Sequence, residues 1–112
     1  MAATLRAWFN TRPLMAPDRP CPSRPMDVVA VAQSRDGTAE LRITRRVGNT
    51  YGFHFMAWAN FADAGGGAHH LWHEFHPEHA LVTDSFDTAV NVAFDDARVR
   101  GLELTALERT NA

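Results

Sequence analysis

The segment from residue 51 to residue 61 constrains the fold more than any other part of this chain. It reads Tyr-Gly-Phe-His-Phe-Met-Ala-Trp-Ala-Asn-Phe, with large apolar residues at both alternating sets of positions. In a β-strand, alternate side chains point to opposite faces of the sheet. One set is Tyr51, Phe53, Phe55, Ala57, Ala59 and Phe61, and the other is Gly52, His54, Met56, Trp58 and Asn60. Both faces of this strand therefore need a covering layer, because an uncovered face would be an unusually large apolar patch.

Turn residues divide the middle of the chain into four predicted strands. Alternating apolar or β-branched residues occupy positions 27–34, 39–47, about 51–61 and about 68–76. The connections at 35–37, 48–50 and 65–67 contain glycine, which favours tight turns. A short final strand is predicted at 102–107. The sequence thus predicts an α+β fold, in which a four-stranded antiparallel meander is followed by one C-terminal amphipathic helix packed on one face.

The predicted helix has both a buried stripe and end signals. Thr83, Asp84 or Ser85 can cap its first turn, and Asp87 lies where a negative charge favours the helix dipole. Gly101 suits the position just after the last turn. The buried stripe, at the spacing of one helix face, is Phe86, Ala89, Val90, Ala93, Phe94 and Ala97.

Length and proline content predict one domain preceded by an arm. Residues 26–112 suit a single ββββα domain with one core. Residues 1–25 hold five of the six prolines, which exclude a helix interior or a central strand over 13–25 and predict an extended arm. Trp8, Phe9 and Leu14 are the residues expected to pin this arm to the domain or to a neighbouring chain.

Charge and composition narrow the function classes. The arm carries a net charge of +3 and residues 26–112 carry −5, which argues against binding to a phosphate backbone. Arg42, Arg45 and Arg46 are clustered, but the preferred interpretation of Arg42 and Arg46 is a solvated strand face. All positive residues are arginine, as in GC-rich genomes, and this suggests a small bacterial or phage protein.

The chain shows no sign of export or of a structural disulfide. Its apolar runs are far shorter than the ~20 residues of a membrane helix, and its first residues lack the apolar core of a secretory signal. Cytoplasmic localisation is the expectation, with no membrane association. Cys21 is the only cysteine and lies between two prolines, so an internal disulfide is impossible and a bystander thiol is the preferred interpretation.

Turn length determines which side chains share a face. A three-residue loop at 48–50 pairs Ile43 with Phe55 and Leu41 with Ala57, whereas a two-residue loop reverses the faces. The first is preferred, because it places the phenylalanines with the aliphatic core. A three-residue loop at 65–67 then adds Leu71, His73 and Phe75 to that core side. The opposite face becomes the predicted binding surface, with the residues His54, Met56, Trp58, His70, Trp72, Glu74 and His76.

Five of the six histidines fall between residues 69 and 79, so metal binding needs testing. His54, His70 and His76, with Glu74 nearby, form the alternative ligand set for zinc or iron. The segment His73-Glu74-Phe75-His76 is one residue short of the helical zinc motif. Histidines spaced by three also alternate between the faces of a strand. The main prediction is therefore that the protein has no metal and no cofactor.

Protein association explains these features with the fewest assumptions. Aromatic residues, Met and His on one sheet face resemble the core of a protein interface. The sequence predicts a small acidic, non-enzymatic protein-binding module, such as an inhibitor, an immunity-type factor or an assembly factor, with another protein or a second copy as its partner. The alternative is a small His-dependent metal-binding enzyme or ligand-binding protein, with a site around His54, His70, Glu74 and His76. The arm, a second copy or a partner can each cover the face.

Overall fold

The computed structural model describes residues 16–62, 68–77 and 82–110, without the side chains of 60–62, 68 and 69. The elements are β1 (Val28–Gln33), β2 (Ala39–Arg46), β3 (Thr50–Ala62), β4 (Ala68–Phe75), α2 (Phe86–Val99) and β5 (Glu108–Arg109). The strands form one antiparallel sheet in the order β4-β3-β2-β1-β5. The α+β prediction of a meander followed by a helix is confirmed, with one short strand added at the β1 edge.

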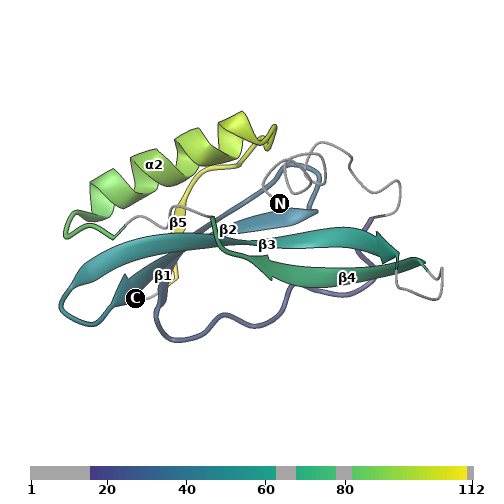
Figure 1. The fold of residues 1–112 in the computed structure, drawn as a ribbon, viewed down its shortest axis with the longest axis horizontal. Helices are drawn as coiled ribbons and strands as arrows, with labels where there is room; N and C mark the ends of the chain where they lie inside the picture. The colour runs from purple at the N-terminus through teal and green to yellow at the C-terminus, as the bar shows by residue number, and fades with distance from the viewer. Residues whose placement is uncertain (1–15, 63–67, 78–81, 111–112) are drawn as a thin grey trace.

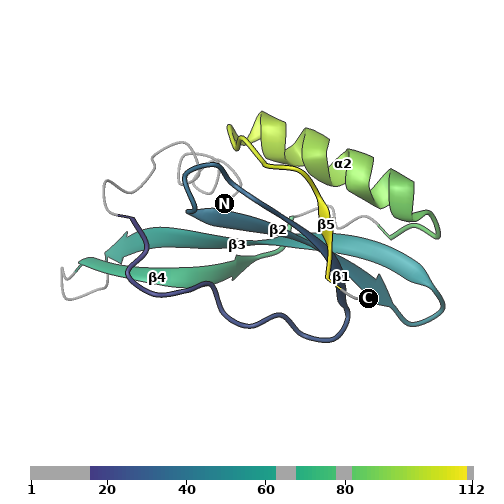
Figure 2. The same cartoon turned by 180° about the vertical axis from the view of Figure 1, so that it is seen from behind.

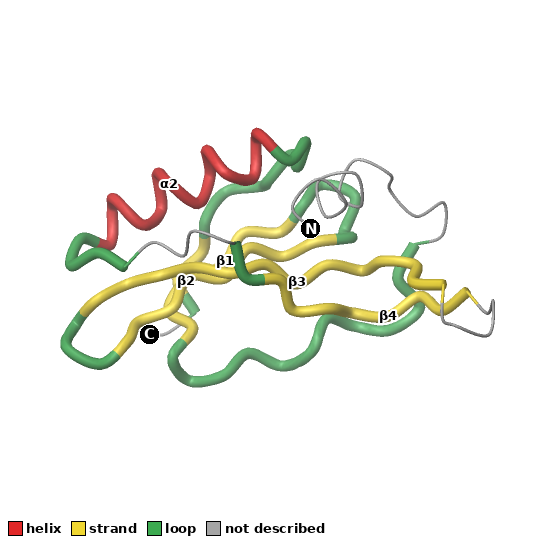
Figure 3. Tube along the Cα trace, in the orientation of Figure 1, coloured by secondary structure: helices red, strands yellow, loops and turns green. Residues whose placement is uncertain are grey.

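The sheet lies between two different layers. Figures 1 and 2 show α2 on one side of the sheet and the chain leading into β1 on the other side. That chain has no helix or strand from residue 16 to residue 27, and Figure 3 shows it as a long loop beside the strands. We call residues 16–27 the arm segment. The predicted anchors Trp8, Phe9 and Leu14 lie outside the described residues.

The main apolar core fills the space between the sheet and α2. Leu41 and Ile43 on β2 and Phe53 and Phe55 on β3 are at most 2% exposed. Burying each such side chain stabilises the fold by roughly 1.5–3 kcal/mol. The helix contributes its small residues Ala89, Ala93 and Ala97 as the fully buried part of the predicted stripe. Partly buried residues packed against this core include Phe86, Val90 and Phe94.

The helix begins and ends where the sequence predicts. The Ser85 hydroxyl accepts a hydrogen bond from the backbone N–H of Thr88 at 3.1 Å, which satisfies one of the unpaired donors of the first turn. Gly101 has a φ of +82°, a conformation that glycine adopts without a Cβ clash. Both end signals are thereby confirmed.

The predicted faces of the sheet are right, but the predicted strand pairs are wrong by two residues. Ile43 pairs with Phe53, and Leu41 pairs with Phe55. The turn is formed by residues 47–49, because Gly48 and Asn49 adopt positive φ values of 81° and 58°. A shift of two residues leaves every side chain on its predicted face. The predicted turn at 65–67 lies outside the described residues.

The C-terminal segment closes one edge of the sheet. The predicted final strand begins later than expected, because residues 102–107 make only an isolated bridge between Leu104 and Ser34. The paired strand is β5, which lies antiparallel to β1. Thr105 also donates its backbone N–H to the carbonyl of Gln33 at 2.8 Å. In the part of the chain that the structure describes, β4 therefore ends the sheet at the opposite side.

Candidate functional site

The seven residues of the predicted binding surface lie on the same face of the sheet, opposite α2. His54, Met56 and Trp58 come from β3, and His70, Trp72 and Glu74 come from β4, with His76 just beyond its end. Cross-strand pairing places Met56 opposite Glu74 and Trp58 opposite Trp72. The rings of His54 and His76 are 5.0 Å apart between centroids.

Burial separates these residues into two groups. His54, Met56 and Trp58 on the central strand β3 are only 6%, 5% and 2% exposed. On the β4 side, His70 and Trp72 are half-buried, and the side chains of Glu74 and His76 are 53% and 55% exposed. In this conformation, a partner can reach the β4 residues but not those of β3.

The arm segment lies against this surface. The indole Nε1 of Trp72 donates a hydrogen bond to the backbone carbonyl of Arg19 at 3.1 Å. The guanidinium of Arg19 lies 5.9 Å from the ring centroid of Trp58, at the outer limit of a cation–π contact. The arm segment therefore covers part of this face. This is one of the three predicted coverings, the others being a second copy of the chain and a partner protein.

A buried group of charges attaches the arm segment to β2. The carboxylate of Glu40, which is 2% exposed, accepts hydrogen bonds from Arg42 Nε at 2.7 Å and from Arg24 Nη2 at 2.7 Å. Burial alone would raise the pKa of Glu40, but the hydrogen bonds from Arg24, Arg42 and Gln33 hold that pKa below its ordinary value. Glu40 is therefore ionised at neutral pH and joins the arm to the sheet.

Arg42 was predicted to lie on a solvated strand face, and this prediction is wrong. Arg42 is only 2% exposed, because the arm segment lies against its guanidinium and accepts hydrogen bonds from Nη2. Arg42 Nη2 donates to the carbonyl of Pro22 and, at 3.4 Å, to the sulfur of Cys21. Arg46, near the end of the same strand, is exposed as predicted.

The thiol of Cys21 belongs to this charged group. Burial raises its pKa, the negative charge of Glu40 raises it further, and the resulting pKa is about 11. The thiolate, which is the reactive form, is therefore scarce at neutral pH. This environment agrees with the interpretation of Cys21 as a bystander.

Part of this charged group can be recognised in the amino-acid sequence. Glu40 and Arg42 are two residues apart, so a strand places them side by side on one face. Their partners Cys21 and Arg24 are 16 to 21 residues away in an irregular segment, and no periodic pattern locates such contacts.

The histidine pair at the end of β4 shares one carboxylate. His76 Nε2 lies 2.9 Å from Glu74 Oε2, whereas His54 Nε2 lies 3.6 Å from Glu74 Oε1, too far for a good hydrogen bond. Among the described residues, the buried His54 Nε2 has no hydrogen-bond partner. Burial lowers the pKa of His54 despite the attraction of Glu74, so His54 is neutral at pH 7 and its approach to Glu74 is not an ion pair there.

The alternative metal ligands do not meet. His54 is opposite His76, whereas His70 is opposite Asn60, six residues farther along β3, a distance of roughly 20 Å. The ring of His70 stacks on Trp58 instead, with 5.9 Å between centroids. Among the described residues, no three His, Cys, Asp or Glu side chains are arranged to hold a metal ion.

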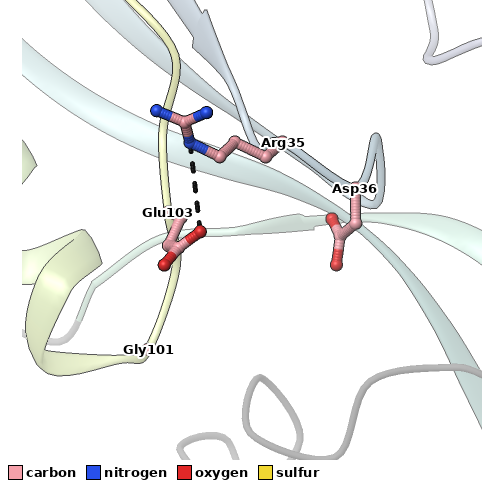
Figure 4. A pocket seen from close by; sticks show the side chains of 4 residues that line it. All are labelled: Arg35, Asp36, Gly101 and Glu103. Atoms are coloured by element: carbon pink, nitrogen blue, oxygen red, sulfur yellow. Dashed lines mark ion pairs between the residues drawn. The ribbon is translucent and has the colours of Figure 1, made fainter.

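Two open pockets lie near the C-terminal end of β1. One, of about 380 Å³, lies between the arm segment and the sheet and is lined in part by Arg19, Cys21 and Trp72. The other, of about 270 Å³, is shown in Figure 4 and is lined by Arg35, Asp36, Gly101 and Glu103. Its Arg35–Glu103 ion pair spans 3.9 Å between side chains that are 72% and 81% exposed, so this contact stabilises little.

The backbone of β4 presents hydrogen-bonding groups at the edge where the described part of the sheet ends. On β3, the N–H of Trp58 points toward β2, since it donates to the carbonyl of Thr38. Because backbone groups alternate along a strand, the N–H and C=O groups of the odd-numbered residues of β3 point away from β2 and toward β4. The two hydrogen bonds between Tyr51 and Thr83 are formed on this same side of β3. The pairing of Ala57 with His73 carries this alternation into β4. The outward-pointing backbone groups of β4 are those of His70, Trp72 and Glu74.

Comparison of this chain with protein-family models, with curated proteins and with solved structures finds no match. Among the described residues, no helix has the length and apolar character needed to cross a membrane.

Proposed function

We propose that this chain is a non-enzymatic protein-binding module whose binding element is β4. The observation that carries the proposal is the coincidence of two features on one strand. β4 ends the sheet in the described part of the chain, and it also bears the accessible residues of the predicted binding surface, His70, Trp72 and Glu74, with His76 next to them.

An open sheet edge favours a partner that binds as an additional strand. Its unpaired N–H and C=O groups form main-chain hydrogen bonds with an extended segment, while neighbouring side chains provide specificity. Soluble proteins usually protect such edges with lysine, proline or a bulge. β4 has the sequence Ala-His-His-Leu-Trp-His-Glu-Phe, which contains neither lysine nor proline.

The side chains of β4 suit an interface. Leu71 is 41% exposed on the α2 side of the sheet, and Trp72 is half-buried on the arm side. Tryptophan is among the residues that most often dominate binding energy, because it buries a large rigid surface. The hydrogen bond from Trp72 to Arg19 holds the indole in one orientation before binding, which reduces the entropy lost on association.

Site-specific photo-crosslinking in the producing cells tests this function. A benzophenone amino acid at position 71 should crosslink one defined protein, whereas the same probe at Val92, 37% exposed on α2, should not. Adding His70→Pro should abolish the crosslink, because proline removes an outward N–H. His70→Ala removes the side chain but keeps the N–H, so it is the matched control and should retain much more of the crosslink than His70→Pro. Equal behaviour of these two variants, or crosslinks from position 92 alone, would contradict the proposal.

A further inference from the structure

We propose that the strand added to β4 is β4 of a second copy of this chain, antiparallel and related by a two-fold axis at Trp72. This inference rests on the proposed binding function of β4 and names its partner. The chain would then form a symmetric dimer in which the two sheets join along their β4 edges. The sheet face that the arm segment contacts would not be the dimer interface.

The positions of the outward backbone groups determine how two such edges can pair. In an antiparallel pair, the residues that exchange both hydrogen bonds are those whose backbones point toward the partner strand. For β4 these are His70, Trp72 and Glu74, as the bonds of Trp58 and Tyr51 indicate. A two-fold axis at Trp72 pairs this residue with itself and pairs His70 with Glu74 of the second copy.

Charge selects this axis over its neighbours. With the axis at Trp72, each Glu74 lies opposite a histidine, and this contact occurs twice. With the axis at Glu74, the two carboxylates would lie directly opposite each other, which is destabilising. With the axis at His70, the two histidines would face each other and Trp72 would lie opposite Ala68. Among the axes at these three outward-pointing residues, the one at Trp72 pairs the longest part of β4, residues 69–75, and keeps like charges apart.

The side chains on the α2 side of the sheet also match across this axis. Leu71, 41% exposed, lies opposite His73 of the second copy, so its apolar surface is covered by a ring instead of water. Two five-stranded sheets would then join into one sheet of ten strands. Open twisted sheets reach about this size without splitting.

Sedimentation velocity on the purified full chain is the first test. The wild-type protein should sediment as a dimer, and His70→Ala, which loses the contact with Glu74 but keeps the backbone N–H, should weaken the dimer much less than His70→Pro. His70→Pro should sediment as a monomer. Its far-ultraviolet circular dichroism spectrum should be unchanged, since the backbone N–H of residue 70 points away from β3 and makes no hydrogen bond to it. A wild-type protein that stays monomeric at every accessible concentration, or a dimer that survives His70→Pro, would overturn the inference.

Disulfide trapping tests the position of the axis. Leu71 and His73 of two copies form a non-hydrogen-bonded pair with Cα atoms about 4.5 Å apart, close enough for a disulfide. A mixture of Leu71→Cys and His73→Cys proteins should therefore give a covalent dimer on mild oxidation. Each variant alone should not, and because Cys21 is present in all samples it serves as an internal control. Covalent dimers in single-variant samples as abundant as in the mixture would exclude the Trp72 axis.

The outcomes separate this inference from the function on which it rests. If the wild-type chain is monomeric but the probe at position 71 captures a different protein, the binding function stands and the second copy is excluded as partner. If the probe captures nothing and the chain is monomeric, both proposals fail.

Discussion

His54 is a histidine that the fold keeps neutral. It is 6% exposed, and burial lowers its pKa from the ordinary value of 6.5, while the negative charge of Glu74 opposes this shift without reversing it. The pKa of His73 is lowered by burial as well. A group with a lowered pKa takes up protons less readily in the folded chain than in the unfolded chain. Acidification should therefore favour unfolding through these histidines.

The pH dependence follows from these signs. The free energy of unfolding should be highest above pH 6.5 and should fall as the pH decreases from 6.5 through the lowered pKa values. The hydrogen bond from His76 lowers the pKa of Glu74, so a second loss should begin below the ordinary value of 4.5. Urea unfolding from pH 8 to pH 4 measures this curve, and His54→Gln should flatten its upper part. A His54 titration midpoint at or above 6.5 by NMR would contradict this account.

Residue-level prediction succeeded where periodicity carries information. Ser85, Gly101 and the alanines of the helix stripe occupy the predicted roles, because each is determined by neighbours within a few positions. The burial of Arg42 was not predictable in this way. Its environment depends on Pro22 and Cys21, about 20 residues away in a segment without regular structure.

At the scale of elements, the arm segment is attached by charge. Arg42 and Glu40 have side chains that are 3% and 2% exposed, and Arg24 of the arm completes the group. Removing one partner of a buried ion pair leaves an uncompensated charge and typically costs about 3–5 kcal/mol. The arm should therefore depend on Glu40 for its position.

Glu40→Gln tests this dependence. It should lower the free energy of unfolding by about 3 kcal/mol or more, because Arg42 remains buried without a carboxylate. The backbone amides of Cys21 and Arg24 in the arm segment should also exchange faster in the native state, because their attachment to the sheet is lost. The control is Asp95→Asn, which breaks an ion pair whose side chains are 67% and 79% exposed and should cost at most about 1 kcal/mol. Equal losses in the two variants would show that the buried group does not hold the arm.

The sequence predicted the meander, the helix and the two faces, but not the strand pairing. Side-chain alternation has a period of two, so it reports the face and cannot distinguish registers that differ by two residues. The turn lies at 47–49 because Gly48 and Asn49 both adopt positive φ values. The presence of glycine in the sequence predicts a turn but not which residues form it. The late position of β5 likewise depends on pairing with β1 and not on a local pattern.

At the scale of the whole molecule, the surfaces that the helix and the arm segment leave uncovered determine where a partner can bind. The sequence correctly indicated that α2 could cover only one face, and the arm segment supplies part of the second layer (Figures 1 and 2). The predicted surface is thereby reduced to its β4 side, where the sheet also ends in the described chain. A binding element that combines an edge with exposed side chains could not be found from the sequence, because the position of the arm was unknown.

Backbone amide exchange measured residue by residue is the most direct test of the open edge. In dilute, partner-free protein, the amides of His70, Trp72 and Glu74 should exchange rapidly, while those of Leu71, His73 and Phe75 are protected by β3. Association, produced by raising the protein concentration or by adding the crosslinked partner, should slow the first three selectively. Protection of His70, Trp72 and Glu74 already in the dilute protein, or rapid exchange that association leaves unchanged, would contradict a binding role for β4.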